Sequence, residues 1–256
     1  MTPEDIGSRL LYRDGLMLII NKPAGLAVHK GPKGGASLED YFDVLRFGLP
    51  RMPALAHRLD KETSGCLVLG RHRKALADLN LMFRNGKVGK TYWAVVEGGP
   101  QEPEGKIDLP LGRLDDKIGW WMKHDPEGLP SQSTWKVMGR AEGVTWLALE
   151  PLTGRTHQLR VHCATSGFPV LGDNIYGSAP RSGGPRLHLH ARQIVVPLYK
   201  NKPPIKVTAP VPEHMKERLK ACGWTEAMDR DVNPPLGLSR PPREAVAAGA
   251  PQSKRQ

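Results

Sequence analysis

Two short polar stretches place charged side chains at close spacing in this chain. The first, residues 57–65, reads HRLDKETSG and sets Asp60 beside Arg58. A carboxylate held near a guanidinium stays ionised and can act as a nucleophile. The second, residues 154–162, reads GRTHQLRVH and supplies Arg155 and Arg160. The two stretches therefore provide a carboxylate that could do covalent chemistry and a second group of charged side chains.

Each of these residues also has an ordinary structural interpretation. An Asp in a loop before Thr-Ser-Gly is more often a cap or a turn residue than a catalyst. An arginine on a helix surface is usually a solvated charge. Tyr92, in the segment Lys90-Thr91-Tyr92, shares one face of a predicted strand with Lys90, and such a tyrosine is often part of a core.

Alternating apolar runs and turn residues predict the elements that must position these side chains. Strands are expected at residues 10–12, 16–20, 66–69, 90–98, 134–137, 144–149 and 186–196. Helices are expected from Ser37 to near Gly48 and at residues 73–84, 156–166 and 213–222. Many short strands with a few helices between them predict an α+β fold, with a mixed, mostly antiparallel sheet and flanking helices and loops. We expect one catalytic domain over residues 1–228 and a disordered tail over residues 229–256.

Composition indicates a polyanionic partner. The chain has 256 residues and a formal net charge of +11, of which residues 229–256 carry +2 and the body carries +9. A folded positive surface can follow a phosphate backbone, so RNA is the expected partner. The three cysteines are widely spaced, and no apolar run is long enough to cross a bilayer, so we expect a soluble, cytoplasmic protein.

The two stretches resemble the HRLD-x-x-TSG and GRTHQ-[IL]-R signatures of the RluA-like family of RNA pseudouridine synthases. Residues 21–26 (NKPAGL) and residues 172–177 (GDNIYG) are similar to two further elements of the family, and the second of these is expected to be structural or to support the site. The resemblance extends from about residue 11 to about residue 207. It implies the pseudouridine synthase catalytic fold in a compact form without an S4 domain.

The resemblance also implies roles for individual residues. Asp60 is expected to be the catalytic nucleophile and Tyr92 to pack on the target base, with a part in proton transfer. Arg160 is expected to form an ion pair with Asp60, although Arg155 competes for this role. Arg58 is expected to take the place of the flipped base.

The remaining expectations concern the RNA and the residues around it. His57 should brace the loop at the RNA-binding site, and Arg155 should otherwise contact RNA phosphate. The isomerisation of uridine in ribosomal or transfer RNA needs no metal and no other cofactor, and nothing in the sequence demands more than a monomer. The specific RNA and uridine are not indicated by any motif.

Three other interpretations compete with this one. A non-catalytic RNA-binding or RNA-folding protein on the same scaffold would explain the positive charge. A glycoside hydrolase would need a second carboxylate, and Glu62 is too close in the chain to Asp60 to serve. A metal site is the third interpretation, because His188 and His190 occupy alternate positions of a strand and point the same way. No third Cys, His or carboxylate lies at a spacing typical of a metal ligand.

Overall fold

The computed structural model describes residues 2–31, 34–115 and 121–229. The helical elements are α1 (Pro3–Gly7), η1 (Leu38–Leu45), α2 (Arg73–Arg84), α3 (Gln158–Thr165), α4 (Glu213–Ala221) and η2 (Glu226–Asp229). The first strands are β1 (Leu10–Arg13), β2 (Met17–Lys22), β3 (Ala54–Leu55), β4 (Ser64–Gly70), β5 (Gly89–Glu97) and β6 (Glu104–Asp108). The later strands are β7 (Leu111–Arg113), β8 (Met122–His124), β9 (Gln132–Ala141), β10 (Val144–Pro151), β11 (Leu189–Val196) and β12 (Ile205–Thr208).

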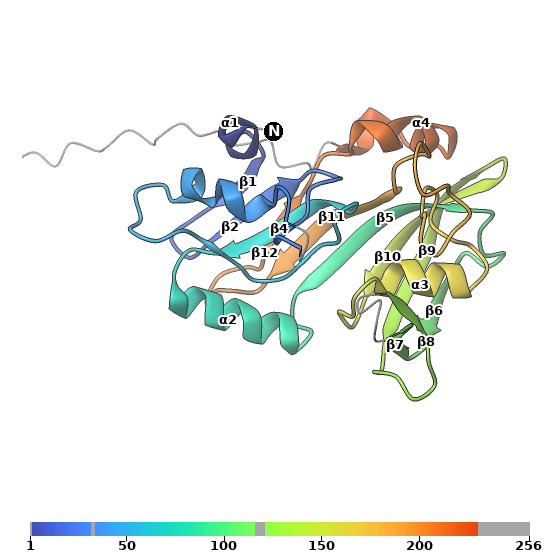
Figure 1. Cartoon of the computed structure of the whole chain (residues 1–256), viewed down its shortest axis with the longest axis horizontal. Coiled ribbons are helices and arrows are strands. Elements are labelled where there is room, and N and C mark those ends of the chain that lie inside the picture. The colour runs from blue at the N-terminus through green and yellow to red at the C-terminus, as the bar shows by residue number, and fades with distance from the viewer. Residues whose placement is uncertain (1, 32–33, 116–120, 230–256) are drawn as a thin grey trace, which may run out of the picture.

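One long sheet forms the centre of the molecule (Figure 1). Its strands follow the order β1-β2-β4-β11-β5-β10-β9-β6, with β3 paired to β4 and β12 paired to β11. Among the described strands all pairs are antiparallel except β11 with β4. The predicted α+β fold with a mixed, mostly antiparallel sheet is therefore confirmed.

Both faces of the first half of the sheet are covered. Successive strand side chains point to opposite faces, and on β2 Leu18 and Ile20 pack with η1, whereas Met17 and Ile19 pack on the side of α2. This explains why the run Met17–Ile20 is apolar without alternation. Each face of this half therefore has its own hydrophobic core, one under η1 and the other over α2.

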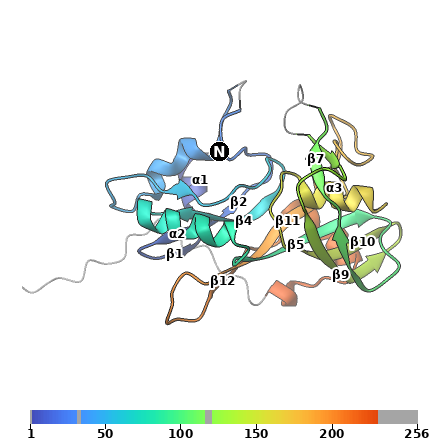
Figure 2. The same ribbon diagram turned by 90° about the horizontal axis from the view of Figure 1, so that it is seen from below.

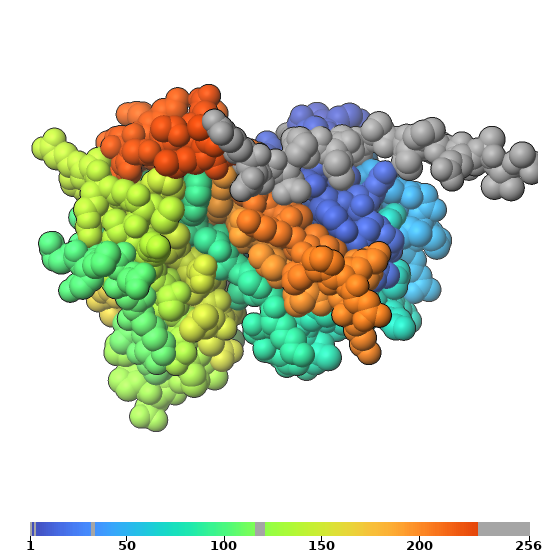
Figure 3. All heavy atoms as spheres, turned by 180° about the vertical axis from the view of Figure 1, so that it is seen from behind, coloured from blue at the N-terminus to red at the C-terminus, as the bar shows by residue number. Residues whose placement is uncertain are grey.

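The second half of the sheet is built in the same way. Leu147 and Leu149 of β10 pack with Leu159 of α3 on one face. Trp146 packs with Met215 and other α4 residues on the opposite face. Figure 2 shows α2 and α3 beside different parts of the sheet. Figure 3 shows α4, in red, at the top of the molecule, on the side away from α2. Among the described elements, loops and not helices cover the sheet between α2 and α3.

Gly65 allows the parallel contact between β4 and β11. Its φ is +107°, and a Cβ at this position would lie 2.2 Å from the Ala191 carbonyl oxygen. The register pairs Gly65 with Ala191, so the two backbones pass too closely for any side chain. The glycine at the end of the HRLDKETSG stretch is therefore a packing requirement of the sheet.

The segment after Ser37 differs from its prediction. It forms the 3₁₀ helix η1 and ends at Leu45, although Ser37 and Asp40 form a capping box at its start. The left-handed φ of Phe47, 47°, does not continue a helix toward Gly48. Short connectors commonly adopt 3₁₀ geometry, and here it brings Leu38, Phe42 and Leu45 into the core.

The remaining strand and helix predictions agree with the described elements to within a few residues, while α1, β3, β6, β7, β8, β12 and η2 were not predicted. Of the tail expected over residues 229–256, only Asp229 is described, and its carboxylate lies 2.6 Å from Arg192. The division at residue 228 stays a prediction. In the described ranges, no helix has the length and hydropathy needed to span a bilayer.

Candidate active site

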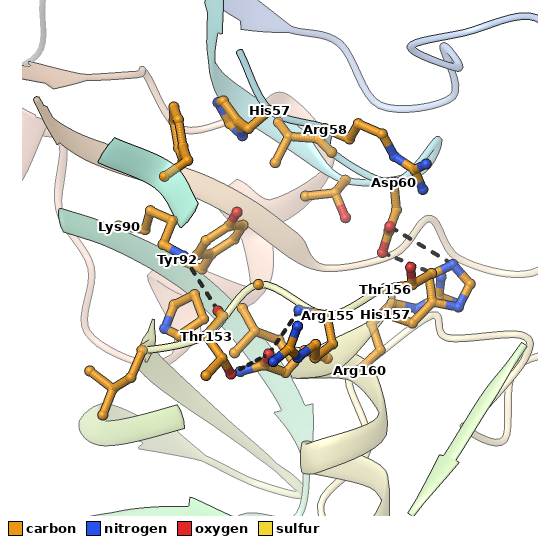
Figure 4. A pocket seen from close by; sticks show the side chains of 18 of the residues that line it. His57, Arg58, Asp60, Lys90, Tyr92, Thr153, Arg155, Thr156, His157 and Arg160 are labelled. Carbon is orange, nitrogen blue, oxygen red and sulfur yellow. Dashed lines mark hydrogen bonds and ion pairs between the residues drawn. The ribbon is translucent and has the colours of Figure 1, made fainter. Parts of the chain in front are cut away.

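The two polar stretches meet at one pocket, which has a volume of about 590 Å³ (Figure 4). Its walls come from the loop before β4, the end of α2, the start of β5 and the loop between β10 and α3. Such a volume is typical of sites for small molecules or single building blocks of polymers. All six predicted site residues line the pocket: His57, Arg58, Asp60, Tyr92, Arg155 and Arg160.

The loop that carries Asp60 is tied to the N-terminal part of the chain. The Lys61 carbonyl accepts hydrogen bonds from Lys22 Nζ at 3.0 Å and from the Gly25 amide at 2.9 Å. Lys22 is fully buried and also donates to the Pro23 and Leu26 carbonyls. The NKPAGL segment therefore fixes the backbone next to Asp60.

The carboxylate of Asp60 faces two basic side chains. Its Oδ2 lies 3.9 Å from Arg160 Nη1, and its Oδ1 lies 3.8 Å from His157 Nε2. Within the described residues, no donor lies within hydrogen-bonding distance of either oxygen. The carboxylate is thus attracted by positive charge while its lone pairs stay available for attack.

Arg160 has Asp173 as its main partner. Its Nε and Nη2 donate to the two Asp173 oxygens, both at 2.7 Å. Asp173 also accepts from the backbone amides of Ile175 and Tyr176, and its side chain is fully buried. Burial opposes ionisation, but the hydrogen bonds and charge of Arg160 hold the pKa of Asp173 below its usual value. This fixed anion orients the guanidinium toward Asp60.

Of the two competing arginines, Arg160 is the one that lies beside Asp60. The Arg155 Nε instead donates to the Pro130 carbonyl at 3.2 Å, and the side chain is exposed. Its backbone amide is held by Gln158 Oε1, which also accepts from Thr153 Oγ1 at 2.7 Å. Gln158 therefore braces the loop, and Arg155 is left at the pocket rim.

His157 is a site residue that the sequence did not identify. It precedes α3 in the left-handed conformation, with φ 52° and ψ 17°, a strained position for a residue with a side chain and one found often at functional sites. Its Nδ1 shares a hydrogen bond of 2.7 Å with Tyr176 Oη. Burial lowers the pKa of His157, which favours the neutral ring although Asp60 opposes this shift. Only the position of the histidine inside the second stretch could have suggested it.

Tyr92 and Lys90 reach the pocket from the same face of β5, as predicted. Burial raises the pKa of the Tyr92 phenol well above its usual value, and the nearby negative charge of Asp60 raises it further. The phenol is therefore protonated at neutral pH. Lys90 Nζ lies 3.4 Å from the Thr153 carbonyl oxygen.

His57 and Arg58 point in different directions. His57 Nε2 accepts from the Val68 amide at 3.1 Å, and its ring stacks on Phe83 at a centroid distance of 4.4 Å. Burial lowers the pKa of His57 to about 3, so the ring is neutral. Arg58 is exposed at the pocket rim. The roles of both residues in RNA binding stay predictions.

The histidines considered as metal ligands have protein partners. His188 Nδ1 lies 2.8 Å from the Arg186 carbonyl oxygen, and His190 Nδ1 lies 2.9 Å from Ser64 Oγ. In the part of the chain that the structure describes, no group of three or more His, Cys, Asp or Glu residues could hold a metal ion. The three cysteines are buried and unpaired with one another.

Comparison with known proteins agrees with this geometry. Residues 16–165 match the family model described as RNA pseudouridylate synthase. An uncharacterised RNA pseudouridine synthase of Zymomonas mobilis is 42% identical over 81% of this chain and 95% of its own length. The ribosomal large subunit pseudouridine synthase C of Vibrio vulnificus is 34% identical over 81% of this chain and 67% of its own.

A solved structure shares the fold. The human RNA pseudouridylate synthase domain containing 4 has a TM-score of 0.71 and 27% identity, covering 85% of this chain and 95% of the other. The family match, the relatives and the shared fold place the chain among enzymes of the isomerase class that act on RNA. The chain belongs to the RNA pseudouridylate synthase family. None of these comparisons favours the alternative of a non-catalytic RNA-binding protein.

Proposed function

We propose that Asp60 is the nucleophile that converts uridine to pseudouridine in a structured RNA. One Asp60 oxygen attacks C1′ of the ribose, the bond from C1′ to N1 breaks, and uracil leaves with the electron pair. The uracil then turns in the pocket, its C5 bonds to C1′, and Asp60 departs as a carboxylate. The C5 proton is then lost and N1 takes up a proton, so the product is an isomer of uridine and atoms and charge balance without an oxidant or a co-reactant.

The observation that carries this proposal is the state of the Asp60 carboxylate. It is held near Arg160 and His157 without a hydrogen bond from a described residue, in a pocket that otherwise carries positive charge. A carboxylate used only for structure is normally hydrogen-bonded when it is partly buried. Asp173, on the other side of Arg160, has such bonds, and Asp60 does not.

The remaining site residues take supporting roles. Arg160 orients Asp60, and Tyr92 packs on the base and can donate its phenolic proton. Reaching a stacked uridine requires extrusion of that nucleotide. Arg58, exposed at the rim, can occupy the space left in the stack. Arg155 is available for phosphate contact, and His57 supports the loop that carries Asp60.

We propose large-subunit ribosomal RNA as the substrate. Support comes from the relatives named as ribosomal large subunit pseudouridine synthases, including the one from Vibrio vulnificus. Transfer RNA is the alternative substrate, and the experiment described below detects pseudouridine in both kinds of RNA. A monomer acting in the cytoplasm, with no metal, is part of the same proposal.

The test is to map pseudouridine in RNA treated with the purified protein. Total RNA from a strain that lacks the protein is incubated with wild type or with Asp60→Asn, labelled with carbodiimide and read by reverse-transcription stops. We expect new stops only with wild type, at one or a few uridines of the large-subunit RNA. The same stops with Asp60→Asn would refute the role of Asp60, and no stops with wild type would refute the activity on free RNA.

A further inference from the structure

The lining of the pocket is strongly unbalanced in charge. Its described residues include one carboxylate, Asp60, and five cationic side chains: Arg58, Arg84, Lys90, Arg155 and Arg160. Of these, Arg160 is held by Asp173, and Arg58, Arg84 and Arg155 are exposed to solvent. Lys90 is the half-buried cation without an acidic partner in the described chain.

The surroundings of the Lys90 ammonium are poor in acceptors. It has three N–H donors, and the Thr153 carbonyl at 3.4 Å is its hydrogen-bond acceptor among the described residues. Burial lowers the pKa of Lys90, and no carboxylate of a described residue offsets this effect. Burying an ammonium group without an anion costs free energy. Such a cost at a pocket wall is typical of a group that binds a charged ligand.

The chain leaves the Lys90 ammonium accessible from the pocket. Gly154, the first residue of the GRTHQLRVH stretch, lies opposite it, and a Cβ on this glycine would be 4.0 Å from Nζ. A larger side chain at this position would extend over the ammonium. Figure 4 shows Lys90 beside Tyr92 and Thr153, on the side of the pocket away from Asp60.

We propose that Lys90 binds a phosphodiester group of the RNA next to the target uridine. This inference rests on the proposed function, because phosphate is the anionic group of RNA. Tyr92 lies two residues further along the same face of β5, so one strand would hold both the base and the adjoining backbone. Lys90 is then a positioning residue that sets the ribose relative to Asp60.

The experiment pairs a change in the protein with a change in the RNA. The probe is a fluorescent pentamer, AAUAA, together with versions in which one linkage at a time is a neutral methylphosphonate. A 2′-O-methyl group next to the altered linkage stabilises it, and the matched unaltered pentamer carries the same group. Binding is measured by anisotropy at low salt for the protein with Lys90 intact, for Lys90→Gln and for Lys90→Arg, all in the Asp60→Asn background.

We expect one linkage at which the neutral group weakens binding to the protein with Lys90 intact about tenfold, in line with a hydrogen bond to a charged group. In Lys90→Gln, neutralising the same linkage should not change the affinity for the RNA. In Lys90→Arg, neutralising this linkage should again weaken binding, but less than in the protein with Lys90 intact. The exposed Lys87, two residues before β5, supplies the control, because Lys87→Gln should leave the effect of every linkage unchanged. If Lys90→Gln were as sensitive to every linkage as the protein with Lys90 intact, the proposal would be overturned.

A second measurement needs no variant. The ¹⁵N resonance of the Lys90 ammonium should shift when the unaltered pentamer is added and should not shift with the one critical methylphosphonate. An unchanged resonance with the unaltered pentamer would reject the contact even if Lys90→Gln did not fold. The anisotropy and NMR experiments measure RNA binding and therefore test only the role of Lys90. The isomerase activity is tested by the pseudouridine mapping experiment alone.

Discussion

Arg160 donates two hydrogen bonds of 2.7 Å to Asp173, so a guanidinium inside the site is fixed by an acid that does not face the pocket. The same guanidinium lies 3.9 Å from Asp60. One arginine therefore contacts both a structural acid, Asp173, and the proposed nucleophile, Asp60, and its two short hydrogen bonds are to Asp173. This division explains how Asp60 can be oriented without losing its free lone pairs.

Replacing Asp173 tests the division directly. Asp173→Asn leaves the buried charge of Arg160 without its anion, so the free energy of unfolding should fall by about 3–5 kcal/mol. The turnover number should fall while KM changes little, because Arg160 is no longer held toward Asp60. Urea unfolding and steady-state kinetics measure the two effects. The control is Asp108, which forms an exposed ion pair with Lys106. Asp108→Asn should lower the free energy of unfolding by less than about 1 kcal/mol.

His157 allows a test that separates its ring from its backbone. His157→Asn keeps a residue type that tolerates the left-handed conformation but removes the imidazole that faces Asp60 and Tyr176. We expect the thermal unfolding midpoint to change little and the turnover number to fall roughly tenfold, equivalent to about 1.4 kcal/mol. If His157→Asn were fully active, the contact with Asp60 at 3.8 Å would have no part in catalysis.

Tyr92→Phe removes the phenolic hydroxyl and keeps the ring. The raised pKa of Tyr92 means that the hydroxyl carries its proton at neutral pH, so a proton is present for transfer. A proton-transfer role predicts a turnover number about 10²–10⁴-fold lower, with RNA affinity close to that of wild type. Affinity lost together with turnover would mean that the hydroxyl serves binding. Tyr92→Leu, which also removes the ring, should weaken RNA binding as well.

The close approach at Gly65 predicts a large effect of a single methyl group. In Gly65→Ala the Cβ would overlap the Ala191 carbonyl at a φ of +107°, so the protein should lose more than about 4 kcal/mol of stability or fail to fold. Gly15→Ala is the matched control, since nothing lies within 4 Å of its Cβ position. Chemical denaturation of both variants measures the contrast, and equal stabilities would rule out the steric explanation.

His190 should make stability depend on pH. Burial lowers the pKa of His190 to about 3, so between that value and about 6.5, the usual histidine pKa, the unfolded chain binds a proton that the folded chain does not. Stability is therefore lost as pH falls below about 6.5, by up to about 1.4 kcal/mol per pH unit. His190→Gln should reduce this slope by that amount. Unfolding curves between pH 4.5 and pH 7.5 for both proteins measure it, and parallel slopes would contradict the prediction.

The sequence predicted the strands and helices whose apolar pattern is repeated over several residues. The strand around Cys66–Leu69, the helix at residues 73–84 and the strand that carries Tyr92 all appear as expected. The segment after Ser37 shows the limit of this method, because the same residues satisfy the capping box of an α-helix and of a 3₁₀ helix. The packing of Leu38, Phe42 and Leu45 decides between them.

The site could be predicted only in part, because its pairings are tertiary. The motifs identified Asp60 and Arg160 as candidate site residues, but their spacing did not show whether Arg155 or Arg160 pairs with Asp60. The choice depends on Asp173, which lies 13 residues beyond Arg160 in a separate loop. The GDNIYG segment supports the site through this residue, a contact that the segment's own sequence does not indicate. The left-handed conformation of His157 has no signal in the local composition.

The two partners of Arg160 also bear on the energy of the covalent intermediate. In the proposed mechanism Asp60 becomes a neutral ester when it bonds to C1′, and an arginine that relied on Asp60 alone would be left as an unpaired buried cation. Because Arg160 also donates two hydrogen bonds to Asp173, its charge stays paired on this mechanism after Asp60 is neutralised. The ester then needs no new partner for Arg160 in order to form or to decompose.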